Sequence, residues 1–545
     1  MRDGETATPN PTPVDAELLC GEVVADGRPC PRREASAALR EAWRGQGVAG
    51  LLRVDGPFAA LVRQGGTQWA YRDASALCGL FACLAPDGRW HAASGLDALA
   101  GLASTIDRQA LHEYLRLLDI AAPRAWLRDV RAVGAGQALR LPQGEAAVEE
   151  PPATSRTTPA PPRDFQAAVD ELARRLATSV AERLSDAERP AAFLSGGIDS
   201  ALLCAVAARQ RADIATLTVG FDGAPFDETP VAARIAAHLG LRHEVLRFGR
   251  EDFLAAFDRL ARGMDQPMAD PATMATVLAF DHCKDHFDVM LDGTGADEAV
   301  GAMPPRHVRL AVGVGSLVPA GLRRWLVRGM RHVPALAGYT PVLDFEHPAE
   351  TLMRWRGFTR AEIGELCGGP VSLEDTTFYR TFARFPRRAH FERYSALLNA
   401  MPCDRLTQAM KLTGLRVRYP YCARDVDGFL RQLPTPWLCL PGEPKRILRA
   451  LLARYVPREI WDGPKHGFDF PLHDFLAGDG HALVHRHVLN GRWLARGLLR
   501  PDVVRRHARQ YMAGDRHSMF RVWALVVLGA WLDAHEDLTI PAPGD

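Results

Sequence analysis

The fold of this chain is decided by the stretch Phe193-Leu194-Ser195-Gly196-Gly197-Ile198-Asp199-Ser200. The apolar residues 191–194 predict a buried strand, and residues 201–208, after the loop, predict a helix. A strand, a glycine loop and a helix N-terminus together make an anion site, because free N–H groups point at a phosphate and glycines let the backbone approach it. A plain serine–glycine turn would also account for Gly196 and Gly197, but it would not account for the further motifs between residues 219 and 468.

The segments around this loop alternate between strand and helix patterns. We expect strands at 214–221, 242–248 and 286–291, and helices at 165–184 and 228–239. This alternation predicts an α/β fold with a doubly wound parallel sheet, whose ligand lies at the carboxyl ends of the strands. From about residue 345 onward the sequence is rich in predicted helix.

A proline-rich run divides the chain. Pro151-Pro152-Ala153-Thr154-Ser155-Arg156-Thr157-Thr158-Pro159-Ala160-Pro161-Pro162 cannot pack as helix or strand, so we expect a linker over 151–163. Short apolar runs between glycine turns, such as 48–52 and 58–62, predict a β-rich domain over 1–150. The α/β domain with its helical additions is then expected over 164–545.

The composition is that of an ordinary globular chain, with 47% hydrophobic and 24% charged residues. A net charge of +1 is too small for bulk attraction to nucleic acid or membrane, so we expect neither as a partner. No apolar run reaches the ~20 residues that span a bilayer, and residues 1–15 carry no signal-peptide core. Ten cysteines without C-x-x-C, and no H-E-x-x-H, speak against zinc and dithiol chemistry. We expect a reduced, cytoplasmic protein with Cys78 and Cys83 in its core.

Six landmarks in fixed order make the chain resemble the asparagine synthetase family. The S-G-G-x-D-S loop is similar to the pyrophosphate loop of ATP pyrophosphatases, which split ATP between its α and β phosphates. The kinase-type loop would need a lysine that is missing here. The further landmarks are Val219-Gly220-Phe221, the D-x-P-x-x-D-P segment at 265–271, the G-x-G-x-D-E loop at 293–298, Arg418-Tyr419-Pro420-Tyr421, and the run from Lys445 through Pro457 to Lys465-His466-Gly467-Phe468.

The resemblance implies ATP and Mg²⁺ as cofactors and an acyl-adenylate as intermediate. Adenylation joins two anions and therefore needs carboxylate-held magnesium together with cations and N–H groups. By resemblance Asp199 and Asp297 hold the metal, Ser195, Gly196, Gly197 and Ser200 cradle pyrophosphate, and Leu194, Val219, Asp292 and Gly293 frame the nucleotide. Lys465 would stabilise charge in the transition state. Lys445 would help with pyrophosphate, and a plain surface charge stays an equal alternative for it.

The N-terminal domain departs from the glutamine-hydrolysing members, whose nucleophile is a cysteine exposed by loss of Met1. Position 2 is Arg2. Nineteen residues precede Cys20-Gly21, and only a short stretch separates it from Asp55-Gly56-Pro57-Phe58. Fragments of the glutaminase pattern persist at Arg72-Asp73, Ala93-Ser94 and 133–136. We therefore expect a shortened glutaminase-like domain without glutaminase chemistry.

The acceptor side of the synthetase domain is also altered. Thr294 stands where asparagine synthetase has glutamate and β-lactam synthetase has tyrosine, and Arg416 replaces the glutamate of L-E-x-R-x-P. These departures resemble the branch with β-lactam synthetases and lasso peptide cyclases. We expect a lasso peptide cyclase that closes a macrolactam on a precursor peptide, with a leader peptidase and a leader-binding protein as candidate partners. A β-lactam synthetase-like cyclase, an ammonia-dependent asparagine synthetase and a dead nucleotide-sensing scaffold stay open.

An attacking ammonium needs a base within hydrogen-bond reach. Asp404 falls near the catalytic glutamate of β-lactam synthetase by a gapless match back from Pro420, and a helix-capping or ion-paired Asp404 is an equal alternative. His466 is a weaker candidate base. We expect His243 to be structural.

Overall fold

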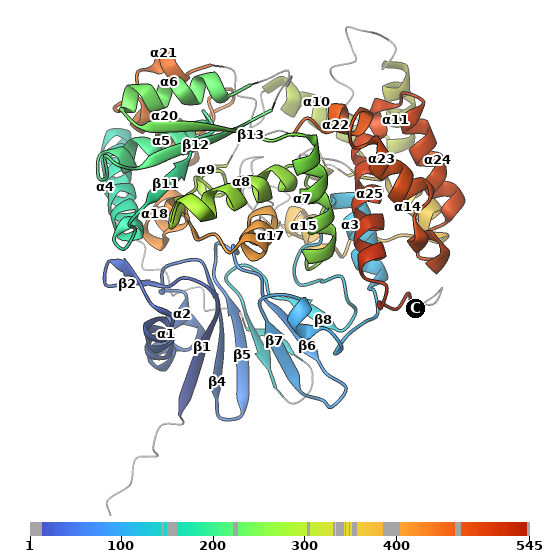
Figure 1. Ribbon diagram of the computed structural model, residues 1–545, viewed down its shortest axis with the longest axis horizontal. Helices are drawn as coiled ribbons and strands as arrows, with labels where there is room; N and C mark the ends of the chain where they lie inside the picture. The colour runs from blue at the N-terminus through green and yellow to red at the C-terminus, as the bar shows by residue number, and fades with distance from the viewer. Residues whose placement is uncertain are drawn as a thin grey trace, which may run out of the picture.

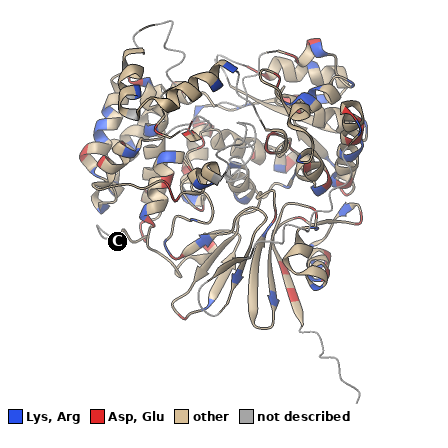
Figure 2. Ribbon diagram, turned by 180° about the vertical axis from the view of Figure 1, so that it is seen from behind, with Lys and Arg blue, Asp and Glu red and all other residues tan. Residues whose placement is uncertain are grey.

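The computed structural model describes residues 13–142, 146–149, 162–221, 227–301, 306–330, 333, 343, 345–347, 349–350, 357–384, 404–463 and 470–541. A β-rich half lies at the bottom of Figure 1, and a larger α/β half lies above it. The linker expected at 151–163 falls almost wholly outside these residues. Charged segments of both signs are mixed over most of the molecule, in keeping with the small net charge (Figure 2).

The α/β half is built on a parallel sheet. Within the described residues its order is β13-β12-β11-β14-β15, and every neighbouring pair is parallel. The strands are β11 (Pro190–Phe193), β12 (Ala215–Gly220), β13 (Arg242–Arg247), β14 (Val289–Leu291) and β15 (Val417–Arg418). The chain runs outward from β11 through β12 to β13 and returns to β14 on the other side. The strand order therefore reverses between β11 and β14, which is where such sheets bind ligands.

Both faces of this sheet are buried, because successive strand residues point to opposite sides. Val289 and Leu291 pack with α4 (Phe165–Leu184) and α5 (Ile198–Ala208). Met290 between them packs with α7 (Arg250–Gly263) and α8 (Thr273–His286). The doubly wound α/β prediction is confirmed for this half. The expected strand at 286–291 is shorter than predicted, since α8 continues to His286.

Further helices surround this core. They are α6 (Thr229–Leu239), α9 (Ala296–Val300), α10 (Arg306–Leu317), α11 (Ala320–Met330), α14 (Arg360–Cys367), α15 (Thr377–Arg384), α17 (Asp404–Thr413), α18 (Arg424–Leu430), α19 (Thr435–Leu438), α20 (Arg446–Leu452), α21 (Arg458–Trp461), α22 (Leu472–Ala477), α23 (His481–Leu483), α24 (Pro501–Met512) and α25 (Met519–Ala534). The largely buried α25 packs on α7, and the Trp531 indole N–H donates to the Met264 carbonyl at 3.0 Å. A search of the described helices for one long and apolar enough to cross a membrane finds no candidate.

The N-terminal half has three layers. One antiparallel sheet contains β1 (Val14–Gly21), β4 (Phe58–Gln64), β5 (Thr67–Arg72), β9 (Ala138–Leu141) and β10 (Ala147–Glu149), and a second contains β6 (Phe81–Leu84), β7 (Trp90–Ala93) and β8 (Val130–Ala132). Along β4, Phe58 and Val62 pack in the core on the side of α1 (Arg32–Gln46), while Leu61 between them packs toward the second sheet. A short pair, β2 (Val24–Ala25) with β3 (Arg28–Pro29), and α3 (Arg108–Leu117) complete this half.

One strand expected in this half is wrong. The apolar run at 48–52 forms the short helix α2 (Val48–Leu51). Gly47 precedes it with a φ of +59°, and a side chain on Gly50 would come within 1.8 Å of the Ala42 carbonyl oxygen. The run is apolar because it packs closely against α1, not because it alternates in a sheet.

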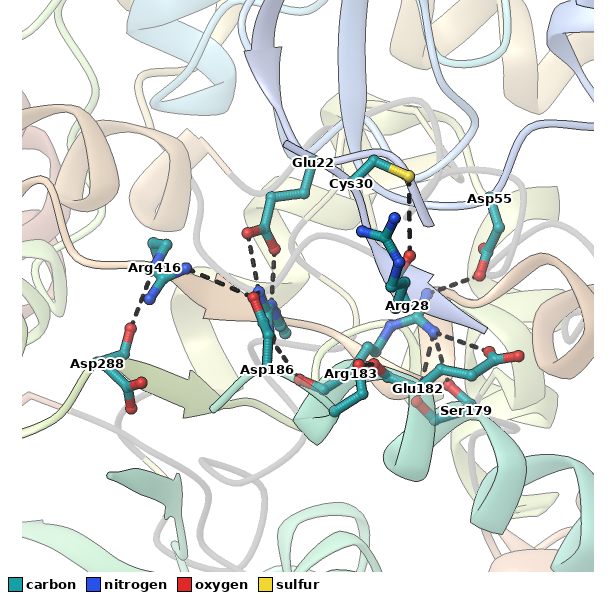
Figure 3. A network of polar contacts seen from close by, with 12 residues as sticks. Glu22, Arg28, Cys30, Asp55, Ser179, Glu182, Arg183, Asp186, Asp288 and Arg416 are labelled. Carbon is teal, nitrogen blue, oxygen red and sulfur yellow. Dashed lines mark hydrogen bonds and ion pairs between the residues drawn. The ribbon is translucent and has the colours of Figure 1, made fainter. Parts of the chain in front are cut away.

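Two buried arginines, Arg418 and Arg183, join the two halves through partly exposed carboxylates (Figure 3). The Arg418 guanidinium, on β15, donates to both carboxylate oxygens of Glu22 at 2.7 and 3.0 Å and to both of Asp186 at 2.5 and 3.1 Å. Arg183 of α4 donates to Asp55 at 3.0 Å. Because bidentate arginine–carboxylate pairs fix orientation as well as distance, this network holds the β-rich half in register with the β14–β15 edge.

Candidate active site

The loop after β11 folds around its own serine hydroxyls. The Ser195 N–H donates to Ser200 Oγ at 3.1 Å, and Ser200 Oγ donates to the Gly197 carbonyl at 3.2 Å. Gly196 has a φ of +73°, and a Cβ there would lie 3.3 Å from the Glu228 carbonyl oxygen. Glycine is therefore needed at this turn, and α5 begins directly after it with its N-terminus toward the loop. The strand, glycine loop and helix N-terminus predicted from the sequence are present, and anion binding by them stays a prediction.

The strands behind the loop hold it in place. The Thr218 hydroxyl on β12 donates to the Leu194 carbonyl, and the buried Leu194 N–H donates to the Leu217 carbonyl at 2.8 Å. His243 on β13 contacts the Thr216 hydroxyl at 3.0 Å through Nδ1, and burial lowers the pKa of this imidazole. His243 thus supports the sheet behind the site, as the sequence predicted.

A second loop follows β14 and lies against the first. A Cβ on Gly293 would lie 3.2 Å from the Ser200 nitrogen, so glycine allows the two loops to touch. Asp292 Oδ1 accepts from the Thr294 N–H at 2.8 Å and from the Thr294 hydroxyl at 2.5 Å. Glu298 accepts from the Gly295 N–H at 2.9 Å, and burial raises the pKa of Glu298 to about 7.

Lys445 joins the two predicted metal carboxylates. Its Nζ forms an ion pair with Asp199 and another with Asp297 at 2.7 Å. Lys445 and Asp199 are largely buried, whereas the Asp297 side chain is 48% exposed. Burial alone would lower the pKa of Lys445, but the two carboxylates outweigh burial and raise that pKa above its usual value. The surface-charge alternative for Lys445 does not fit this buried position.

This pair of carboxylates fits a magnesium ion chemically. Mg²⁺ prefers carboxylate oxygens and completes its shell with waters and phosphate oxygens. Asp199 comes from the first turn of α5, and Asp297 from the first turn of α9. A search of the described residues for three or more His, Cys, Asp or Glu side chains that could hold a metal together finds none. Waters and phosphate oxygens would complete a magnesium shell here.

The Arg418–Tyr421 landmark supports both loops, a role that the sequence did not reveal. The Arg418 carbonyl accepts from the Asp292 N–H at 3.0 Å, and the buried Tyr421 hydroxyl donates to the Asp199 carbonyl at 3.0 Å. Cys422 lies against Gly295, where an added Cβ would approach its Sγ to 2.5 Å. The place of these residues in an ordered landmark was the only signal for their role.

The landmark at 265–271 lies at the junction between the halves. Asp265 Oδ1 accepts from the Leu96 N–H at 2.7 Å and pairs with Lys411 at 2.6 Å. Lys411 also pairs with Asp97 at 3.2 Å. These contacts join α17 to the N-terminal half.

The structure does not describe the side chains of three residues that the sequence predicts for the site. Lys465 and His466 lie outside the described residues, and Asp404 opens α17 with a side chain that the structure does not describe. Val219 lies half-buried near the end of β12, directly before Gly220. Beyond it, Phe221 contacts Phe470 edge-on with ring centroids 5.6 Å apart. An apolar wall therefore adjoins the carboxyl end of β12.

Cys20, the cysteine in the C-G pair of the N-terminal half, lies inside a strand. Cys20 pairs with Ala59 across β1 and β4, so its nitrogen belongs to a peptide bond in a sheet. A hydrogen bond with Cys78 is the main cause that lowers the pKa of Cys20. The Arg72 guanidinium donates to the Val133 carbonyl at 3.1 Å and to the Ala76 carbonyl at 2.7 Å. Arg72 therefore has a structural role, since its guanidinium binds backbone carbonyls.

Comparisons with known proteins find similar sequences over most of this chain. The family model described as asparagine synthase matches residues 171–533. A putative glutamine-hydrolyzing asparagine synthetase of Mycobacterium tuberculosis (strain ATCC 25618 / H37Rv) is 27% identical over 462 residues, which cover 79% of this chain and 68% of that protein. Glutamine-hydrolyzing asparagine synthetase 1 of Bacillus subtilis (strain 168) is 24% identical over 444 residues, with 78% and 68% covered. A carboxyethyl-arginine beta-lactam-synthase of Streptomyces clavuligerus is 28% identical over 252 residues, with 44% and 46% covered.

Proposed function

The chain belongs to the asparagine synthase family and is an ATP-dependent amide-forming ligase, and from this premise we propose that it joins a carboxylate and an amine of one substrate. The substrate we favour is a precursor peptide, whose Asp or Glu side chain is linked to its own N-terminal amine as in a lasso peptide cyclase. The products are then a macrolactam, AMP and pyrophosphate.

The first half-reaction activates the carboxylate. A carboxylate oxygen attacks the α-phosphorus of ATP, the bond to the β-phosphate oxygen breaks, and pyrophosphate leaves. The loop from Ser195 to Ser200, at the N-terminus of α5, would offer hydroxyl and N–H donors to the departing charge in exchange for its internal hydrogen bonds. Mg²⁺ held by Asp199 and Asp297 would neutralise phosphate charge. Lys445 then leaves these carboxylates and contacts phosphate oxygens within the same site.

The second half-reaction forms the amide. The amine attacks the acyl carbon, AMP leaves with the oxygen that joined them, and the amine loses a proton. By family resemblance Lys465 stabilises the negative charge that develops, and Asp404 accepts the proton. Both roles are part of the proposal.

The observation that carries this proposal is the environment of Cys20. A glutaminase of this family needs a thiol with a free α-amine beside it, because that amine is its base. The Cys20 nitrogen lies in the β1–β4 ladder, and Arg72 is bound to backbone carbonyls. A synthetase without its own ammonia source needs another amine, and an amine on the substrate itself meets that need. Glutamate release from glutamine that is lost in Cys20→Ala would contradict this step.

Thr294 supports the same conclusion on the acceptor side. The Thr294 hydroxyl donates a hydrogen bond to Asp292 Oδ1 at 2.5 Å within the loop. A family member that receives ammonia carries a glutamate at this place, by the resemblance. The β-lactam-synthase match favours a small-molecule cyclase as the second candidate. A dead scaffold is disfavoured, because a nucleotide sensor would have no need for both metal carboxylates.

The test uses a peptide from a small open reading frame beside the gene. With this peptide we expect ATP–pyrophosphate exchange and a product that has lost one water. An N-acetylated peptide should support exchange but no ring, and a peptide with amide in place of the acceptor carboxylate should support neither. Turnover with free aspartate and ammonium would instead establish an asparagine synthetase. A leader peptidase and a leader-binding protein encoded nearby would be added in turn, since ring closure in this proposal depends on a free amine.

A further inference from the structure

Among the large apolar side chains of the described residues, the four with the highest exposed fractions lie on two consecutive helices, α10 and α11. Leu310 (69% exposed), Val314 (63%) and Leu317 (84%) lie on α10, and Trp325 (68%) lies on α11. Every other large hydrophobic residue in the described part is exposed to 51% or less. Large apolar surface of this kind marks an interaction site more often than scattered single residues do. We call these four residues, with Leu322 and Leu326 of α11, the α10–α11 face.

The face points away from the core that anchors the helices. On α10 the buried residues are Val312 and Gly315, whereas Leu310, Val314 and Leu317 follow an i, i+4, i+7 pattern. With 3.6 residues per turn, that stripe lies about half a turn from the buried side. On α11 the buried Arg323 and Val327 lie about half a turn from Trp325 in the same way. Each helix therefore packs on the protein with one side and exposes apolar side chains to solvent on the opposite side.

A buried arginine fixes the two helices to each other. Arg323 donates through NH1 to the carbonyls of Gly315 at 2.6 Å and Val318 at 2.9 Å, and through NH2 to that of Phe345 at 2.5 Å. Its guanidinium lies 3.8 Å from the centroid of the Phe345 ring. Arg323 thus satisfies the C-terminal carbonyls of α10 from within α11. The exposed apolar side chains therefore lie on two helices that are held together by hydrogen bonds.

The charged side chains of this segment are all basic. Residues 299–343 contain six arginines and two histidines but no aspartate or glutamate, in a chain whose net charge is +1. Arg306 and Arg309 of α10 are exposed. A basic segment with outward Leu, Val and Trp is the composition of helices that lie in the headgroup region of an anionic bilayer. A second copy of the same face would bring arginines together and is disfavoured by charge.

We propose that the α10–α11 face binds an anionic phospholipid surface. The leucines, Val314 and Trp325 would enter the boundary between headgroups and acyl chains, and the exposed Arg306 and Arg309 would contact lipid phosphates. In Figure 1, α10 and α11 lie on the opposite side of the molecule from the N-terminal β sheets, so the β-rich half would point away from the lipid. The expectation of no membrane partner followed from net charge, which averages out this local excess. The inference does not depend on the identity of the substrate.

Cosedimentation of the full chain with vesicles tests this inference. We expect binding to vesicles of phosphatidylcholine with phosphatidylglycerol and little to phosphatidylcholine alone. High salt should weaken binding, since the screening length falls from about 10 Å at 0.1 M to about 3 Å at 1 M. Leu317→Glu and Trp325→Glu should each weaken it at least about tenfold, because each removes apolar burial and adds repulsion.

Met512→Glu is the matched control, because Met512 is an outward apolar residue (38% exposed) at the end of another helix, α24. It should bind vesicles like the unmodified chain, and all variants should keep their melting curves and ATP–pyrophosphate exchange. Absence of binding to the anionic vesicles would overturn the proposal, as would binding that Leu317→Glu and Trp325→Glu leave intact. Self-association of the unmodified chain that these variants abolish, without vesicle binding, would assign the face to a second copy instead.

Discussion

Lys445→Met tests the idea that an ammonium occupies the place of the metal. The substitution keeps the apolar stem of the side chain but leaves Asp199 and Asp297 facing each other without their shared cation. We therefore expect two linked effects, which are a loss of stability without metal and a gain in affinity for free divalent cations. A merely structural lysine would produce only the first.

The magnitude follows from burial. Removing one partner of a buried ion pair costs about 3–5 kcal/mol. Asp297 is 48% exposed and contributes less than a buried partner, so we expect about 2–3 kcal/mol. In the unmodified protein a metal must first displace the ammonium. If that displacement costs about 1.4–2.8 kcal/mol, free Mn²⁺ binds about 10- to 100-fold more weakly there than in Lys445→Met.

Electron paramagnetic resonance of free Mn²⁺ without nucleotide measures this difference directly. Urea unfolding with and without Mg²⁺ should show that the metal restores part of the stability of Lys445→Met. Adding Asp199→Asn to the variant should abolish the gained Mn²⁺ affinity, which assigns it to this site. Equal Mn²⁺ affinity in Lys445→Met and the unmodified protein would refute the reasoning, even if both proteins still made the adenylate.

Four further predictions concern the same site. Asp199→Ala and Asp297→Ala should each slow adenylate formation at least ~10²-fold, measured as ATP–pyrophosphate exchange at saturating Mg²⁺, and near-normal exchange would remove them from the metal site. Gly293→Ala should raise KM for ATP about tenfold with an unchanged melting curve, because its Cβ would press on the Ser200 nitrogen from 3.2 Å; an unchanged KM would mean that the loops can separate freely. Lys465→Met should lower kcat while leaving ATP affinity within a few-fold, the pattern of an interaction made only in the transition state, and a loss confined to ATP binding would contradict it. Asp404→Asn should slow ring closure more than exchange, since only the second step needs a proton acceptor, and equal effects on both would return Asp404 to a structural role.

The sheet and its loops were predictable because their signals are local. An apolar run followed by glycine and then by a helix pattern predicts a strand–loop–helix unit. Since parallel strands end at one edge of the sheet, Asp199 and Asp297 could be expected to lie near each other. The wrong strand at 48–52 has the opposite cause. A five-residue apolar run looks alike in a strand and in a buried helical turn, and its packing against Ala42 decides between them.

The supporting contacts could not be predicted, because they join residues far apart in the chain. The sequence pattern does not say that Lys445 reaches both Asp199 and Asp297. Nor does it say that the Arg418 guanidinium donates to Glu22 of the other half while the Arg418 carbonyl accepts from the Asp292 N–H. Such contacts arise from how the layers pack. The roles of Lys465 and Asp404 stay predictions.

The central claim is an AMP-forming ligase that takes both carboxylate and amine from one substrate. The most direct measurement follows nucleotide products by ³¹P nuclear magnetic resonance and the peptide by mass spectrometry in one reaction without glutamine or ammonium. We predict one AMP and one pyrophosphate for each peptide that loses one water. Formation of ADP and phosphate, or a product that appears only when glutamine or ammonium is added, would contradict the claim.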